Sequence, residues 1–122
     1  MSTVVTIFQV IVAISILNVW LVNYSKPSQW RGGNAQNIFE EFQAYGLPNW
    51  LCYVVGFLKV GLALAILASI YFDEIRVPSA LGLGALLMGS IVMHIKIKDS
   101  FKKSFPAILF LLMSLYIAFP LF

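Results

Sequence analysis

The fold class follows from residues 46–72, GLPNWLCYVVGFLKVGLALAILASIYF, an apolar run whose middle carries one charged residue, Lys59. A helix of this length can cross a bilayer, because each residue adds about 1.5 Å and the hydrocarbon core is about 30 Å thick. The same rise places Lys59 about 16 Å beyond Pro48, near the middle of the membrane. An unpartnered cation at that depth costs on the order of 3 kcal/mol or more, so we expect Lys59 to face protein or water.

The composition of the whole chain agrees with a membrane protein. Of its 122 residues, 61% are hydrophobic and 11% are charged, which leaves too few polar side chains to cover a water-soluble surface. The length allows one domain, residues 1–122, and no separate soluble domain. The single cysteine, Cys52, cannot form an intramolecular disulfide, which excludes the dithiol chemistry of disulfide-forming membrane enzymes.

Three further apolar runs accompany the central one. We expect membrane-spanning helices at about residues 4–24, 49–72, 79–97 and 106–122. Pro106 is expected to open the last helix. Between the first two helices, residues 35–45 have large apolar side chains on one side of a helix and polar side chains on the other. This pattern predicts a short helix at the membrane interface. The predicted fold is all-α: an integral membrane four-helix bundle with a short amphipathic interfacial helix between helices 1 and 2.

The basic residues gather in the first and third connections between these helices. They are Lys26, Arg31, Lys96, Lys98, Lys102 and Lys103. The second connection and the termini hold only Arg76. The positive-inside rule therefore predicts an inner (cytoplasmic) membrane protein with both termini outside. On this topology His94, Asp99 and the interfacial helix lie at the cytoplasmic rim and Lys59 lies deeper, which predicts a funnel open to the cytoplasmic leaflet.

Helical spacing places small and polar residues near Lys59. Gly56 lies on the same stripe of its helix, and Asn18 of the first helix is expected to face the bundle interior, with Gln9 about half a turn away. Lys59 has two interpretations. It donates a hydrogen bond to an acidic or carbonyl-bearing ligand, or it is structural and bonds to helix carbonyls, Asn18 or Ser114. Asn18 likewise has a second interpretation, in which its side chain makes an interhelical hydrogen bond that serves packing only.

His94 and Asp99 are the candidate polar residues at the rim. His94 is interpreted as bonded to the backbone or to Asp99, as a proton-transfer group, or as a single haem ligand. Glu40 or Glu41 reaching toward His94 or Lys59 is a further hypothesis. One histidine and one cysteine are too few for a zinc, iron–sulfur or bis-histidine haem site, so we expect no tightly bound metal or cofactor. The sequence shows no phosphate loop or nucleophile motif, and we predict neither stand-alone catalysis nor nucleic-acid binding.

Three motifs carry a family resemblance. They are Gly46-Leu47-Pro48, Gly56-Phe57-Leu58-Lys59-Val60-Gly61, and His94 followed by Asp99 and then Pro106. Through these motifs the chain, from about Phe39 to its end, resembles the DoxX-like family of small four-helix membrane proteins. It departs from the family pattern at one position, because relatives usually have a glycine before the aspartate and this chain has Lys98.

The resemblance implies a cellular setting for the protein. Named members accompany thiosulfate:quinone oxidation and terminal oxidase systems, others resemble partners of thiol and peroxide defence, and distant animal relatives look like membrane chaperones for receptor assembly. We therefore expect a redox-associated accessory subunit in the lipid bilayer, with a membrane oxidoreductase as partner and a quinone-like or other amphiphilic ligand near Lys59. The candidate ligand-binding residues are Lys59, His94, Asn18, Gly56 and Asp99.

Two alternatives stay open. In the first, the protein is a non-catalytic interaction or assembly factor, and small-residue faces on its second and third spanning helices dock a partner or a second copy in a homo-oligomer. In the second, it transports protons or small solutes. The second ranks lower because nothing in the sequence resembles an inverted repeat with broken helices.

Overall fold

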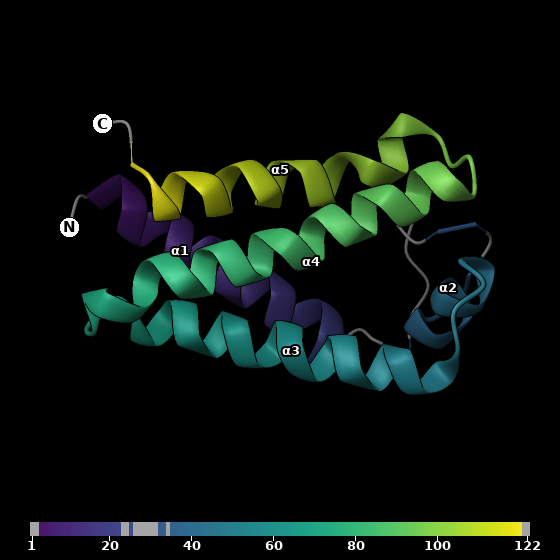
Figure 1. Ribbon diagram of the computed structural model, residues 1–122, viewed down its shortest axis with the longest axis horizontal. Coiled ribbons are helices and arrows are strands. Elements are labelled where there is room, and N and C mark those ends of the chain that lie inside the picture. The colour runs from purple at the N-terminus through teal and green to yellow at the C-terminus, as the bar shows by residue number, and fades with distance from the viewer. Residues whose placement is uncertain (1–2, 23–24, 26–31, 34, 121–122) are drawn as a thin grey trace.

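The computed structural model describes residues 3–22, 25, 32–33 and 35–120, and this part of the chain contains helices and no strands. The α-helices are α1 (Thr3–Leu17), α2 (Ile38–Ala44), α3 (Asn49–Ala68), α4 (Arg76–Lys96) and α5 (Phe101–Ala118) (Figure 1). A π-helical turn, Asn18–Val22, continues α1, and a 3-10 turn, Asp73–Ile75, leads into α4.

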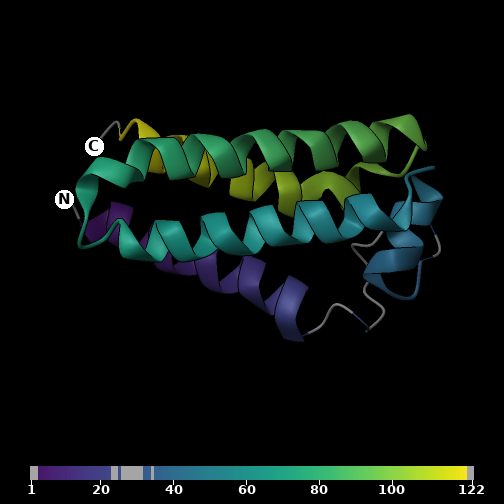
Figure 2. The same cartoon turned by 60° about the horizontal axis from the view of Figure 1, so that its bottom comes forward.

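The four long helices run antiparallel to their chain neighbours and form one bundle (Figure 1). α1 and α4 each pack against both α3 and α5, so the four helices close into a ring. The two ends of the chain lie at one end of the bundle and α2 lies at the other (Figures 1 and 2). Each long helix, with its flanking turn where it has one, is long and apolar enough to cross a membrane. The predicted all-α membrane bundle, with a short helix between its first two spans, is confirmed.

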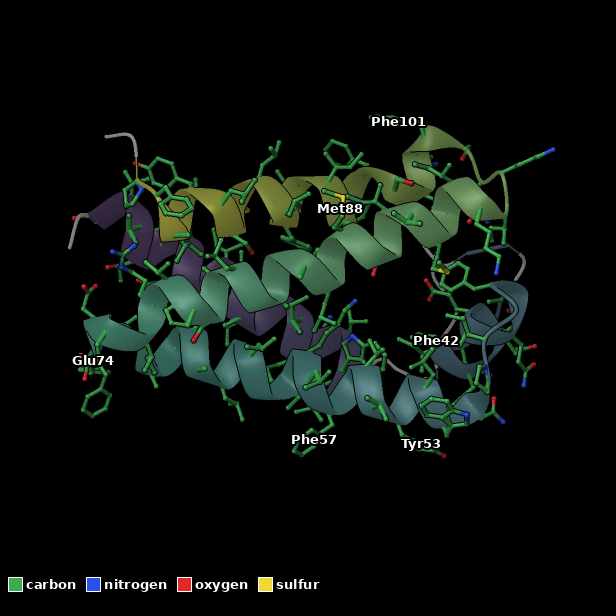
Figure 3. The ribbon with its side chains drawn as sticks, in the orientation of Figure 1. Phe42, Tyr53, Phe57, Glu74, Met88 and Phe101 are labelled. Carbon is green, nitrogen blue, oxygen red and sulfur yellow. The ribbon has the colours of Figure 1, made fainter. Side chains whose placement is uncertain are left out.

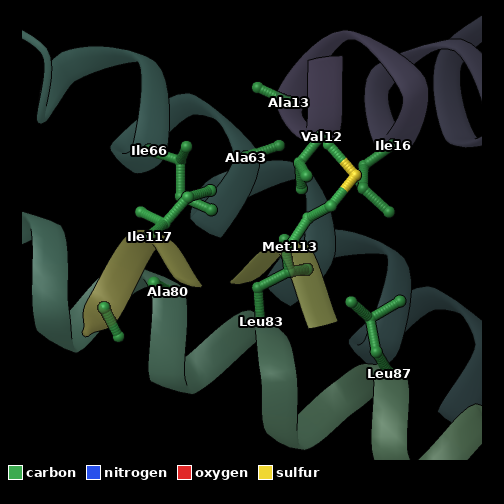
Figure 4. Close-up of a cluster of buried hydrophobic side chains, with 11 residues drawn as sticks. Val12, Ala13, Ile16, Ala63, Ile66, Ala80, Leu83, Leu87, Met113 and Ile117 are labelled. Atoms are coloured by element: carbon green, nitrogen blue, oxygen red, sulfur yellow. The ribbon is translucent and has the colours of Figure 1, made fainter. Parts of the chain in front are cut away.

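The centre of the bundle is filled by small and medium-sized apolar side chains from all four long helices (Figure 4). Val12, Ala63, Leu83 and Ile117, one from each helix, are fully buried. Large apolar side chains instead lie on the outside, where Phe57 is 79% exposed and points away from the bundle (Figure 3). Because lipid chains are as apolar as these side chains, such a surface is stable in a bilayer.

Two helices begin earlier than predicted, both near prolines. α5 begins at Phe101, so Pro106 lies inside the helix and does not open it. Pro106 has no N–H with which to continue the helical hydrogen bonding, but it lies close to the start of α5, and Lys102 is exposed in the first turn of that helix. α4 begins at Arg76 and keeps Pro78 within its first turn, where proline is well tolerated.

Several of the predicted ranges extend beyond the ends of the observed helices. α2 is shorter than predicted at both ends, and α3 and α5 stop early, at Ala68 and Ala118. The first span changes from α-helix to π-helix after Leu17. Residues 23–24 of its predicted range lie outside the described residues.

Arg76 ties the start of α4 to the end of α5. Its Nε donates to the carboxylate of Asp73 at 2.9 Å, and its Nη1 donates to the backbone carbonyls of Ile117 and Ala118. The last carbonyls of a helix have no partner inside the helix, and a cation is favoured beside them. Arg76 therefore fastens the bundle at the end that holds the termini.

Candidate functional site

Lys59 lies inside the bundle, with 7% of its surface exposed. Its ammonium donates a hydrogen bond to Oγ of Ser90 on α4 at 3.1 Å. It also lies 5.6 Å from the centre of the Trp20 ring, within cation–π range. Lys59 therefore faces protein, as its cost in lipid requires. Neither Asn18 nor Ser114, its predicted structural partners, bonds to it.

Lys59 lines a cavity of about 340 Å³, which we call the Lys59 cavity. It lies between α2, α3, α4 and the π-helical turn, and most of its lining side chains are apolar. The charged or hydroxyl-bearing side chains in the lining are those of Lys59, Glu41, Tyr45 and Ser90. The opposite charges of Lys59 and Glu41 attract each other. A cavity of this size, apolar with a few polar groups, is typical of small-ligand sites.

The motif Gly46-Leu47-Pro48 forms the turn that holds α2 against α3. Gly46 has a φ of +79°, a conformation that favours glycine, and this allows the N–H of Leu47 to bond back to the carbonyl of Phe42 at 2.9 Å. Pro48 is the residue that precedes α3. As a result Phe42 points from α2 toward the bundle (Figure 3) and meets the Trp20 ring edge-on. The turn thereby positions α2 as one wall of the Lys59 cavity.

A chain of hydrogen bonds joins α2 to the end of α4. Nδ1 of His94 lies 2.7 Å from a carboxylate oxygen of Asp99, and Nε2 lies 3.3 Å from the hydroxyl of Tyr45. The Tyr45 hydroxyl donates in turn to Glu41 at 2.6 Å. His94, Tyr45 and the side chain of Asp99 are all nearly inaccessible to solvent. The predicted contact between His94 and Asp99 is therefore present, and Glu41 reaches His94 through Tyr45.

The backbone at the end of α4 brings Asp99 back over His94. Lys98 takes a left-handed φ of +58°, and the N–H groups of Lys98 and Asp99 bond to the carbonyls of Ile95 and His94 at 3.0 and 2.9 Å. This is a Schellman motif, in which the left-handed position is usually glycine. The glycine that relatives usually carry is thus replaced by Lys98 without loss of the turn. The backbone N–H of Gly33 then donates to both oxygens of Asp99, at 3.1 and 3.3 Å.

Gly56 provides the space in which the Trp20 ring lies against α3. A Cβ atom at Gly56 would come within 2.7 Å of two ring carbons of Trp20. On the far side of Trp20 lies a second cavity of about 360 Å³, lined almost wholly by apolar side chains and by the thiol of Cys52. Trp20 and Ile38 line both cavities. Gly56 therefore makes room for a ring that lines both cavities, although Gly56 itself lines only the second one, and its role in ligand binding stays a prediction.

Asn18 does not belong to this site. It is exposed, at the start of the π-helical turn, and lines neither cavity. Gln9, expected on the other side, is instead 1% exposed and donates to Oγ of Ser69 at 2.8 Å. The prediction that Asn18 faces the bundle interior assumed a continuous α-helix, whereas a π-helical turn has more residues in each turn and changes the directions of its side chains.

The partners of Lys59 were not predicted. Ser90 and Trp20 meet Lys59 through contacts between helices, and a single sequence carries no signal for such register. Tyr45 was identified only as part of the apolar face of its helix. The sequence offers one indication of its role. Tyr45 lies four residues after Glu41, and residues at this spacing contact each other on a helix.

Comparison with known proteins agrees with this architecture. No curated protein and no solved structure matches the chain. A family model, described as the DoxX-like family, matches residues 7–116. The match includes Lys59, the His94–Asp99 pair, the whole of α2, α3 and α4, and most of α1 and α5. The chain therefore belongs to the DoxX-like family.

Proposed function

We propose that this small membrane protein is a redox-associated accessory subunit that binds a quinone-like amphiphile in the Lys59 cavity. The observation that carries the proposal is a buried lysine in the wall of a cavity whose lining is mostly apolar. Packing alone does not require a cation at such a cost. The setting in which family members work makes a quinone the first ligand to test.

The geometry around Lys59 suits a carbonyl oxygen. An ammonium has three N–H donors, and Ser90 accepts one of them. Among the described residues no carboxylate lies within 4.0 Å of Nζ, so a donor remains for a ligand. The Trp20 ring offers an aromatic surface on which a planar ring can stack. The volume of about 340 Å³ accommodates a head group of this kind.

A binding titration tests the proposal. A short-chain ubiquinone is titrated into the purified protein in lipid nanodiscs, and heat release gives the affinity of wild type and of Lys59→Met. A hydrogen bond to a charged group contributes about 1.5–3 kcal/mol, so the affinity should fall by roughly 10- to 150-fold. Lys102→Met, which removes an exposed lysine, is the matched control and should bind like wild type. Equal affinity with and without Lys59, or no binding by either protein, would refute the proposal.

A second candidate function is that of an interaction or assembly factor. Gly61 on α3 and Gly89 on α4 are exposed, and a Cβ atom at either would meet nothing within 4 Å. Exposed small residues let another membrane helix approach closely. Gly84, by contrast, is buried next to Leu111 of α5 and serves packing inside the bundle.

Crosslinking in membranes tests this second candidate. Gly61→Leu or Gly89→Leu should abolish a crosslinked dimer or partner complex, whereas Met88→Leu, which puts the same side chain on the exposed face of α4 without adding bulk, should not. A monomer in wild type and in both glycine variants would remove this candidate.

A further inference from the structure

The hydrogen-bonded chain from Glu41 through Tyr45 and His94 to Asp99 has a capability beyond ligand binding. We propose that it is a proton relay, in which one proton moves between the His94 ring and the carboxyl group of Glu41 through the hydroxyl of Tyr45. The inference rests on the proposed function in one respect only, namely the identity of the group that receives the proton in the Lys59 cavity. The relay itself requires no ligand.

Counting donors and acceptors gives the positions of the hydrogens. The Tyr45 hydroxyl has one hydrogen, which it donates to Oε1 of Glu41, so Nε2 of His94 must donate at their 3.3 Å contact. On the other side of the ring, Nδ1 lies 2.7 Å from a carboxylate oxygen of Asp99, which can only accept. Both ring nitrogens then carry hydrogens, and His94 is an imidazolium opposite two carboxylates.

A second arrangement of protons satisfies the same contacts. The Nε2 proton passes to the hydroxyl oxygen of Tyr45 while the hydroxyl proton passes to Glu41. One N–H and one O–H bond break and two O–H bonds form, so two protons each cross one hydrogen bond, the net transfer from His94 to Glu41 is one proton, and no electron moves. His94 becomes neutral, Tyr45 donates to it, and Glu41 becomes a carboxylic acid that donates to Tyr45. The heavy atoms need not move between the two arrangements.

The two ends of the relay differ in what they face. Both oxygens of Asp99 accept from the backbone N–H of Gly33, and one of them lies 3.9 Å from Nζ of Lys103, so Asp99 is held in place at the end of the relay farther from the cavity. Glu41 and Tyr45, at the other end, line the Lys59 cavity. The relay therefore moves a proton from a buried ring to the cavity wall, where a bound carbonyl oxygen can accept it.

Charges on the neighbouring helices set the balance between the two arrangements. Lys59 on α3 carries a charge opposite to that of Glu41, and the two side chains attract each other. Lys96 at the end of α4 donates to the backbone carbonyl of Tyr45 at 3.0 Å. On α5, Lys103 lies next to Asp99. A ligand that alters the field of Lys59 would thus shift the proton along the relay.

The relay can be tested in the ligand-free protein. His94 is the only histidine of the chain, so ¹⁵N-histidine labelling reports on this ring alone. NMR in nanodiscs at one fixed pH gives the ratio of imidazolium to neutral imidazole. Glu41→Gln removes the group that takes the proton but keeps an acceptor for the hydroxyl, and Tyr45→Phe removes the hydroxyl but keeps the ring. Glu40→Gln, at the exposed neighbouring position, is the matched control.

The relay predicts that Glu41→Gln changes this ratio by about twofold or more, that Glu40→Gln does not, and that Glu41→Gln has little effect once Tyr45 is phenylalanine. No effect of Glu41→Gln in the wild-type background would overturn the relay. An equal effect with and without the hydroxyl would overturn it as well, because that result indicates electrostatic coupling through space.

If the variants fail to fold, a measurement on the wild-type protein alone still tests the relay. At fixed pH, the infrared band of a glutamic acid carboxyl and the neutral-imidazole signal should rise and fall together as temperature changes. If they change independently, or if no carboxylic acid is present, the relay is wrong. Because none of these experiments uses a quinone, their outcome does not depend on the binding titration above.

Discussion

Gly56→Ala should destabilise the bundle by displacing Trp20. The added Cβ atom would lie 2.7 Å from two ring carbons, whereas ordinary contacts begin at 3.4 Å, so the ring must retreat from α3 by about 0.7 Å. Overpacking of this kind costs about 1–3 kcal/mol. The Lys59 ammonium, already 5.6 Å from the ring centre, would pass the limit of about 6 Å for a cation–π contact. We therefore expect lower stability and several-fold weaker binding of any ligand in the Lys59 cavity.

Denaturation in detergent micelles measures the change in stability, and the quinone titration measures the change in affinity. Gly61→Ala is the matched control, because it makes the same substitution on the same helix at a position where the new atom meets nothing within 4 Å. Gly61→Ala should leave stability within about 0.5 kcal/mol of wild type. If Gly56→Ala costs no more than Gly61→Ala, the assignment of Trp20 as a packed wall between two cavities is refuted.

Three further predictions concern the helix ends and the orientation. Lys98→Gly should stabilise the protein by about 0.5–1 kcal/mol in the same denaturation assay, because the φ of +58° strains a lysine and not a glycine; an unchanged midpoint would contradict this. Arg76→Met should cost about 1–3 kcal/mol, since it removes the donor to the last carbonyls of α5; hydrogen exchange at the end of α5 should rise, and unchanged protection there would disagree. In a Cys52→Ser background, a membrane-impermeant maleimide should label Glu74→Cys in intact cells and Lys102→Cys only after permeabilisation; the reverse pattern would invert the proposed topology.

The spanning helices and the burial of Lys59 could be predicted because both follow from large transfer free energies. A long apolar run is stable in lipid wherever its neighbours lie, and a cation in its middle is sheltered under any packing that survives. The contact of His94 with Asp99 could also be predicted, because only one helix end and one turn separate the two residues. These features depend on local sequence.

The remaining features depend on how the helices meet. The π-turn after Leu17 rotates Asn18 out of the predicted stripe, and no composition signal marks that change from α-helix. The contact of Lys59 with Ser90 is set by the register of α3 against α4, a difference of small packing energies. The path from Glu41 to His94 likewise requires α2 to dock on the end of α4. Such contacts are decided by tertiary packing and not by the local conformational preferences of the chain.

The exposed side chains of the π-helical turn at the end of α1 bear on how a ligand of the proposed kind would reach the Lys59 cavity. In this turn the Leu21 and Val22 side chains are 59% and 62% exposed, while Trp20 lines both cavities. A molecule that passes this turn comes from the hydrocarbon and not from water. Its occupancy is then governed by how strongly it partitions into the leaflet, so a compound that accumulates in lipid can fill the cavity even when its intrinsic affinity for the protein is weak.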